Sequence, residues 1–127
     1  MAERRKYDIT VTPKAAYIED QSDPSKNRYV FAYTITISNT GEVAAQLVSR
    51  HWIITDAADH TREVKGLGVV GQQPVLEPGE SFKYSSWCPL ETPVGMMHGS
   101  YQMVRENGEG FEIEIAPFAL KARYTVN

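Results

Sequence analysis

Hydrophobic and polar residues alternate along much of this chain. In YVFAYTITIS, residues 29–38, one face carries Tyr29, Phe31, Tyr33, Ile35 and Ile37, and the other carries Ala32, Thr34, Thr36 and Ser38. In FEIEIAPF, residues 111–118, Phe111, Ile113 and Ile115 alternate with glutamates. This period-two pattern predicts half-buried antiparallel strands. Shorter runs predict further strands at residues 7–12, 44–56, 62–70, 81–87 and 100–105.

Turn-forming segments separate these runs, and no apolar stripe at helical spacing extends beyond about ten residues. Roughly seven short strands in such a chain predict an all-β fold, an antiparallel β-sandwich of the immunoglobulin-like or fibronectin type III-like kind. Trp52 lies mid-strand, where immunoglobulin-like sandwiches often bury a tryptophan. Tyr101 follows Gly99 at the spacing of a tyrosine corner, in which the hydroxyl bonds to the backbone.

Composition narrows the class of protein. The chain has 127 residues, a mass of 14.3 kDa, 42% hydrophobic and 23% charged residues, which predicts a single globular domain over residues 1–127. Its net charge of −3 gives no general attraction to nucleic acid. We expect no signal peptide and no membrane insertion. The lone cysteine, Cys88, excludes an internal disulfide and favours a cytoplasmic location.

Three glycines, Gly66, Gly68 and Gly71, have the G-x-G-x-x-G spacing of dinucleotide-binding sites. Such a site needs a helix after the glycines, but Pro74 and Pro78 would stop one. Two interpretations are left. The glycines allow bulges or close backbone approach in a strand. Alternatively, their backbone N–H groups form a phosphate site with Lys65 and with Arg50 on a neighbouring strand.

The loop TDAADHT gathers Asp56, Asp59 and His60. Two carboxylates and an imidazole could hold magnesium or cobalt weakly. Aspartates are equally typical of hairpin turns, because the side chain bonds to its own backbone. The sequence leaves both interpretations open.

The stretch from Trp87 to His98 is apolar for a predicted loop. Met96 and Met97 either plug one end of the sandwich or, exposed with Trp87 and His98, form a partner-binding patch. Cys88 and His98 could support nucleophilic chemistry only if they met beside an orienting group. No such group is recognisable, so we predict no catalytic residue, no enzymatic activity and no cofactor.

Three segments together resemble one known family. They are residues 49–54 (SRHWII), residues 64–74 (VKGLGVVGQQP) and residues 93–101 (PVGMMHGSY). They resemble the ApaG (CorD) family of bacterial proteins. The resemblance implies a fibronectin type III-like sandwich associated with cobalt resistance and magnesium efflux, encoded beside a diadenosine tetraphosphate hydrolase. Similar domains in eukaryotic adaptor proteins look like protein-interaction modules, and the family brings no catalytic residues.

The leading hypothesis is therefore a non-enzymatic cytoplasmic module that binds another protein and influences divalent-cation handling. The alternative is a sensor of pyrophosphate or a dinucleoside polyphosphate at Arg50, Lys65 and the glycine segment. Neither the partner nor the oligomeric state follows from the sequence.

Overall fold

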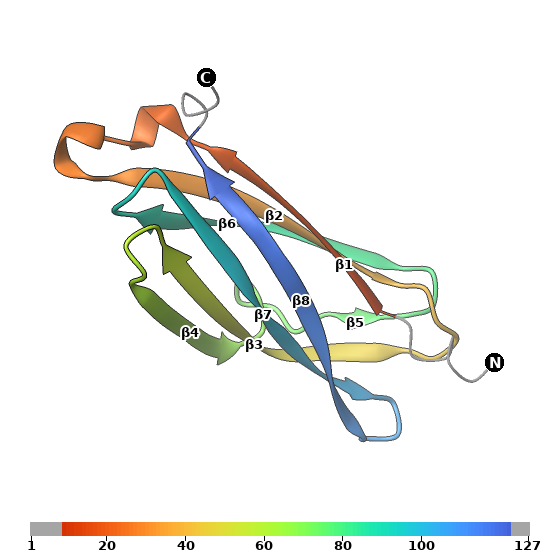
Figure 1. Cartoon of the computed structure of the whole chain (residues 1–127). Helices are drawn as coiled ribbons and strands as arrows, with labels where there is room; N and C mark the ends of the chain where they lie inside the picture. The colour runs from red at the N-terminus through yellow and green to blue at the C-terminus, as the bar shows by residue number, and fades with distance from the viewer. Residues whose placement is uncertain (1–8, 123–127) are drawn as a thin grey trace.

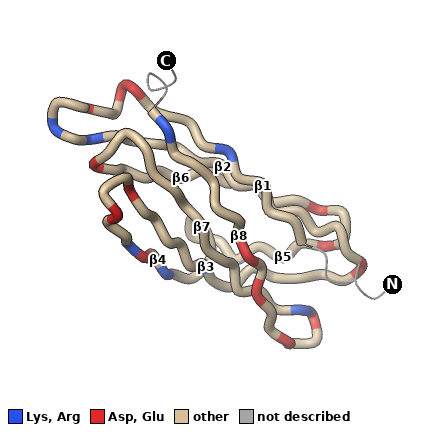
Figure 2. The backbone as a smooth tube through the Cα atoms, viewed as in Figure 1, with Lys and Arg blue, Asp and Glu red and all other residues tan. Residues whose placement is uncertain are grey.

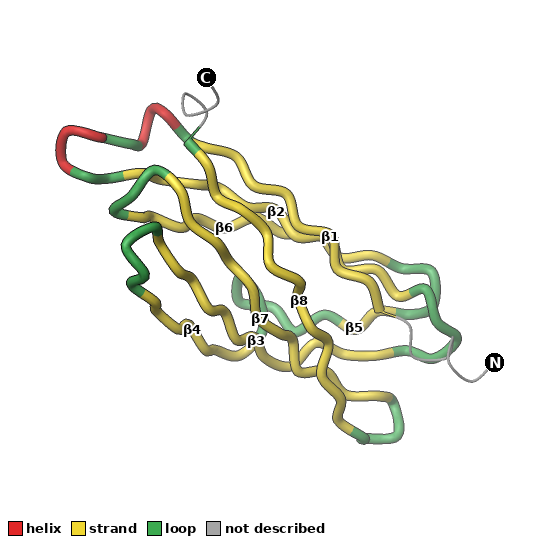
Figure 3. The backbone as a smooth tube through the Cα atoms, in the orientation of Figure 1, coloured by secondary structure: helices red, strands yellow, loops and turns green. Residues whose placement is uncertain are grey.

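The computed structural model describes residues 9–122, which form two facing antiparallel sheets (Figure 1). Its strands are β1 (Ile9–Tyr17), β2 (Tyr29–Asn39), β3 (Ala45–Asp56), β4 (Thr61–Leu67), β5 (Val75–Leu76), β6 (Ser81–Leu90), β7 (Val94–Arg105) and β8 (Gly110–Lys121). Two short 3₁₀ helices, η1 (Glu19–Gln21) and η2 (Pro24–Lys26), lie between β1 and β2 (Figure 3). Within the described residues, no helix is long and apolar enough to cross a membrane.

The two sheets have simple antiparallel order. One sheet contains β1-β2-β6, and the other contains β4-β3-β7-β8 with β5 paired beside β3. The register of β2 and β6 runs from Tyr29 opposite Leu90 to Ser38 opposite Ser81. The predicted all-β sandwich is confirmed, with the two-residue β5 as an element that the alternation did not indicate.

Several strand ends differ from the prediction. β4 ends at Leu67, so residues 68–70 leave the strand and enter a turn. β6 extends to Leu90 and β7 begins at Val94, which leaves only residues 91–93 between them. The expected apolar loop from Trp87 to His98 is thus mostly strand, in two different sheets. Of the run predicted at 7–12, residues 7 and 8 lie outside the described residues.

Trp52 is at the centre of the core, as predicted for a sandwich of this kind. It is 2% exposed, and its ring packs edge-on against Tyr33, Tyr101 and Phe118 at centroid distances of 5.5, 6.2 and 6.0 Å. The predicted tyrosine corner is wrong. The Tyr101 hydroxyl forms a hydrogen bond with the Tyr84 hydroxyl and not with the backbone. Burial raises the pKa of both phenols above the usual value near 10, so both stay neutral.

A β-bulge in β3 decides which side chains reach the space between the sheets. The pairing with β7 shifts between Leu47 and Ser49, so Val48 is the extra residue. Its carbonyl oxygen accepts hydrogen bonds from Gly68 N–H and from the Gln73 side chain. Side chains alternate across a strand, so after this bulge Arg50, with Trp52 and Ile54, points inward.

Candidate functional site

One side of the sandwich, which we call the open side, has a depression between two edge strands, β4 and β6, that belong to different sheets. β4 ends the path of one sheet and β6 ends the other. Arg62 on β4 spans the gap, since its Nη2 donates a 2.6 Å hydrogen bond to the carbonyl oxygen of Pro89 on β6. On the opposite side of the molecule β1 and β8 contact each other. The open side therefore presents edge strands from both sheets.

Trp87 is the most prominent side chain on this open side. It lies on the outer face of β6 and is 58% exposed, whereas the next residue, Cys88, is buried. Trp87 and Pro89 line a shallow depression of about 350 Å³ together with Gln21, Arg28 and Val30. Exposed tryptophans are uncommon and are enriched among the residues that dominate binding at protein interfaces.

A second depression, which we call the slot, lies between the two sheets on the same side. It has a volume of about 170 Å³. Its lining comprises Tyr33, Arg50, Trp52, Ile54, Arg62, Val64, Ser86, Trp87, Cys88 and Pro89. We call the slot, with the exposed residues Trp87, Pro89, Arg62 and Val64 around it, the Trp87 surface. This surface contains an aromatic anchor beside a cavity bordered by two guanidinium groups.

Arg50 is held in place by β4. Its Nη1 donates hydrogen bonds to the carbonyl oxygens of Leu67 at 3.1 Å and Gly68 at 2.8 Å. The guanidinium lies directly against Gly66, where an added Cβ would be 2.8 Å from Nη1. Gly66 therefore has a structural role: the lack of a side chain allows Arg50 to lie flat on the edge strand.

Three of the residues predicted for the anion site, Arg50, Lys65 and Gly66, border one depression, but the side chains of Arg50 and Lys65 point in different directions. Arg50 pairs with Gly66 across β3 and β4, and His51 pairs with Lys65. Since adjacent residues point to opposite faces of a strand, Lys65 projects to the outer face while Arg50 projects between the sheets. The expected approach of Arg50 to Gly68 is present, because Arg50 Nη1 donates a hydrogen bond to the Gly68 carbonyl oxygen. The opposite orientation of Lys65 follows from the pairing of Arg50 with Gly66.

The glycine segment forms a tight two-residue turn. Val69 and Gln72 exchange both backbone hydrogen bonds, and Val70 and Gly71 between them have φ of 43° and 79°. Positive φ at both corners defines a type I′ turn, which favours glycine. The N–H of Gly68 bonds to Val48. The N–H groups of residues 68, 69 and 72 are thus used within the protein, which favours the structural interpretation.

The two turn glycines are expected to tolerate alanine differently. At Gly68, with φ of 62°, a Cβ would overlap the Gln72 carbonyl oxygen, so Gly68→Ala should cost about 3 kcal/mol. At Gly71 nothing lies within 4 Å of an added Cβ, so Gly71→Ala should cost only about 1 kcal/mol for the left-handed backbone. Urea unfolding measures both values. Equal effects would contradict this description of the turn.

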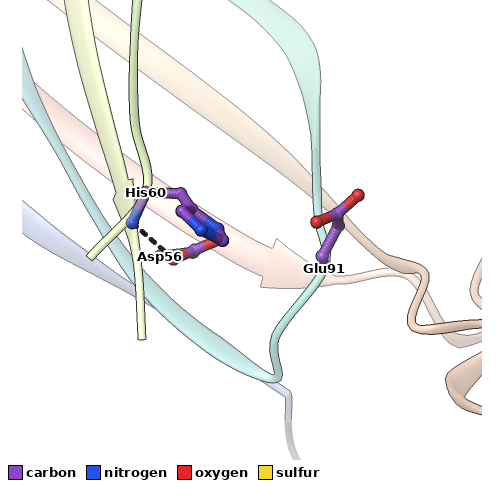
Figure 4. A group of neighbouring side chains, drawn as sticks. All are labelled: Asp56, His60 and Glu91. Atoms are coloured by element: carbon purple, nitrogen blue, oxygen red, sulfur yellow. Dashed lines mark hydrogen bonds and ion pairs between the residues drawn. The ribbon is translucent and has the colours of Figure 1, made fainter. Parts of the chain in front are cut away.

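The predicted metal-binding loop contains a cluster with a different third member. Single ligand atoms of Asp56, His60 and Glu91 lie within 4.8 Å of one another (Figure 4). Asp59 is not part of this group and sits in the turn with φ of 66°. Glu91 reaches the cluster from the connection between β6 and β7, a proximity that no local spacing indicates.

The surroundings of this cluster are poorly suited to a divalent cation. Burial acts to raise the pKa of Asp56, but backbone N–H groups of His60 and Ala58 outweigh it and lower the pKa. These N–H groups occupy Oδ1, and His60 Nδ1 lies 3.4 Å from Oδ2. The pocket of about 640 Å³ around the cluster is also lined by Lys26, Arg28 and Arg62. Hydrogen bonding within the turn explains the Asp56 and His60 arrangement without an ion.

Of the two interpretations of this stretch, the patch of Trp87, Met96, Met97 and His98 does not form, and Met97 fills the sandwich as the other interpretation expected. Met97 is fully buried in the core. Met96 is 43% exposed, but it and His98 lie on the outer face of β7, in the other sheet from Trp87. The expectation failed because the connection between β6 and β7 crosses from one sheet to the other. Trp87 is the member of the set that lies on the open side.

Cys88 and His98 are likewise separated. Cys88 faces the core from β6, whereas His98 alternates with buried Met97 and Gly99 and faces outward from β7. Burial raises the pKa of the Cys88 thiol, although Arg62 acts in the opposite direction. The thiol is thus protonated near neutral pH and far from this histidine, unlike an activated nucleophile.

Comparison with known proteins places the chain in a family. The model of the ApaG domain matches residues 19–105. The chain belongs to the ApaG domain family. A protein named ApaG from Thiobacillus denitrificans is 64% identical over 120 residues, covering 94% of each chain. A crystal structure from Bordetella pertussis, named as an ApaA protein, superposes with a TM-score of 0.91 at 57% identity, covering 92% of this chain and 95% of that one.

The ApaG match spans β2 to β7 and so includes the Trp87 surface. A further relative named ApaG, from Ralstonia nicotianae, is 59% identical over 115 residues, or 91% of this chain and 93% of its own. These names state a family but neither an activity nor a ligand. The function of this ApaG domain has to be inferred from its surface.

Sequence reasoning missed Arg62 and Val64 as surface-forming residues. In TREVKGL they alternate with Glu63 and Lys65, so one arginine falls on the same face as a valine and Gly66. An inward-facing charge is a recognised feature of edge strands. This alternation could have predicted that residues 61–67 form an edge strand beside an open side of the sandwich.

Proposed function

We propose that this ApaG domain is a non-enzymatic protein-interaction module that docks its partner on the Trp87 surface. The observation that carries the proposal is the 58% exposure of Trp87 on β6, beside the slot between two edge strands. A tryptophan that is more than half exposed beside polar side chains such as Gln21 and Arg28 is typical of a residue that dominates an interface.

The edge strands support the same proposal. Exposed strand edges carry unpaired backbone groups that can pair with an extended segment of another chain. Pro89 on β6 and the charged Arg62, Glu63 and Lys65 on β4 oppose indiscriminate pairing. A partner that uses this side must therefore match these side chains, which gives specificity.

Family membership fits a module of this kind. We propose that any role in cobalt resistance or magnesium efflux is exerted through the partner, since the Asp56–His60–Glu91 cluster lies among cations. We also propose a cytoplasmic location, which the single unpaired thiol of Cys88 supports. The alternative, a phosphate-ligand sensor at the glycine segment, is less well supported because Arg50 and Lys65 face opposite ways.

Site-specific photo-crosslinking in living cells tests the proposal. A photoreactive residue replaces Trp87 in one variant and Met96, exposed on the other sheet, in a matched control. We expect a discrete crosslinked protein at position 87 and none at position 96. The same adduct at both positions, or none at position 87, would contradict docking on the Trp87 surface.

A further inference from the structure

The charge around Trp87 is opposite in sign to the charge of the whole chain. The depressions beside Trp87 and Pro89 are lined by four cations, Lys26, Arg28, Arg50 and Arg62, and by two carboxylates, Asp56 and Glu91. The chain as a whole has a net charge of −3. Figure 2 shows basic and acidic positions interspersed in the loop between β1 and β2 and on β4, at the same end of the sandwich. This excess of cations favours an acidic partner.

The slot itself is rich in hydrogen-bond donors. Besides Arg50 and Arg62, its lining residues include Tyr33, Ser86 and Trp52, whose side chains carry hydrogen-bond donors, and they include no Asp or Glu. Trp52 Nε1 is buried without a hydrogen-bond partner among the described residues. Burial raises the pKa of Tyr84 and the Trp52 side chain acts to lower it, so this indole belongs to the polar contacts of the core.

Both guanidinium groups keep donors free for a ligand. Arg50 bonds through Nη1 to two carbonyl oxygens, and Arg62 bonds through Nη2 to Pro89 and, at 3.5 Å, to Cys88 Sγ. Each guanidinium carries five N–H donors. Within residues 9–122, no carboxylate forms an ion pair with either arginine.

We infer that the partner is recognised through a peptide carboxylate that enters the slot between Arg50 and Arg62. Apolar residues flanking that carboxylate pack on Trp87 and Val64. The volume of about 170 Å³ can hold a carboxylate with its methylene groups. Arginine donors favour this chemistry because the guanidinium fork matches the two oxygens of a carboxylate. This inference rests on the proposed docking function and names the chemistry that the surface selects.

Titration with short peptides, followed by NMR, tests the inference on the full chain. The chain contains two tryptophans, so the two indole N–H signals report the slot floor through Trp52 and its rim through Trp87. One probe is acetyl-Ala-Leu-Glu-Glu-Leu-Ala-amide, and the matched neutral probe has glutamine at both glutamates. A third probe is the neutral peptide with a free terminal carboxylate, and inorganic phosphate is the fourth. Each is added up to about 5 mM, where weak binding is visible.

We expect the acidic peptide to shift both indole signals saturably and the neutral amide to leave them unchanged. If the third probe alone binds, the carboxylate is a chain terminus rather than a side chain. Arg62→Gln should weaken the acidic peptide about tenfold, while Lys14→Gln on β1 should not. Gly66→Ala, which displaces the Arg50 guanidinium without removing its charge, should also weaken it.

Three results would overturn the inference. They are equal binding of the acidic and neutral peptides, an unchanged affinity in both the Arg62 and Gly66 variants, and a response of Trp52 to phosphate alone. Any of them together with a specific crosslink at position 87 would leave the docking function standing and reject only the carboxylate. Loss of that crosslink would reject the docking function itself.

Discussion

Gly99→Ala is expected to destabilise the protein by about 3 kcal/mol. Gly99 on β7 pairs with Trp52 on β3 in the middle of the five-stranded sheet. A Cβ at this position would overlap the backbone carbonyl oxygen of His51. The two central strands would have to separate to remove this overlap. The His51 peptide cannot rotate away without breaking the hydrogen bonds between β3 and β7. The same movement would displace Trp52 from the core.

Urea unfolding of Gly99→Ala and Gly110→Ala measures this effect with a matched control. Gly110 begins β8 in the same sheet, and its nearest neighbour to an added Cβ is the Met103 carbonyl oxygen at 3.8 Å. Gly110→Ala should therefore change the unfolding free energy by less than about 0.5 kcal/mol. A Gly99 variant as stable as the Gly110 variant would show that β3 and β7 are farther apart than described.

Asn39→Ala should lower the free energy of unfolding by about 3 kcal/mol, because this buried side chain forms hydrogen bonds with three backbone groups. Asn39 is 1% exposed. Its Nδ2 donates to the carbonyl oxygens of Val43 and Leu76, and its Oδ1 accepts the N–H of Gly41. Alanine would leave these groups without partners at the end of the sandwich where β2 meets β5.

Asn107→Ala is the control for Asn39→Ala. Asn107 Oδ1 accepts one backbone N–H, from Glu109, in an exposed turn where water can replace it. Its loss should cost less than about 1 kcal/mol. Thermal unfolding followed by circular dichroism compares the two variants. Comparable stabilities would mean that Asn39 does not hold this end together.

The fold was predictable because its main signal is local. Alternation in residues 29–38 and 111–118 is visible within ten residues, and it indicates two-faced strands whatever their partners. The buried position of Trp52 was predicted from the sandwich class, in which a mid-strand tryptophan is often buried. The exact ends of β6 and β7 did not follow, because apolar residues near the connection suit a strand and a buried loop equally well.

The candidate site was less predictable because its geometry depends on distant pairing. The face of Arg50 is set by the bulge at Val48, which exists only in the pairing with β7. Glu91 lies near Asp56 because the connection between β6 and β7 crosses from one sheet to the other. The same connection places Met96 and Trp87 in different sheets. The outward position of Trp87 could have been predicted from the sequence. Side chains alternate along a strand, and Trp87 lies an odd number of residues after the inward-facing Tyr84.

The most direct measurement of the docking function is the affinity of the purified crosslinked partner for three forms of this protein. Trp87→Ala should weaken binding at least about tenfold, since truncating a central aromatic residue removes both contact area and water exclusion. Met96→Ala, on the other sheet, should bind like the unmodified chain. All three should unfold at similar urea concentrations. Equal affinity of the Trp87 variant and the unmodified protein would contradict docking on the Trp87 surface.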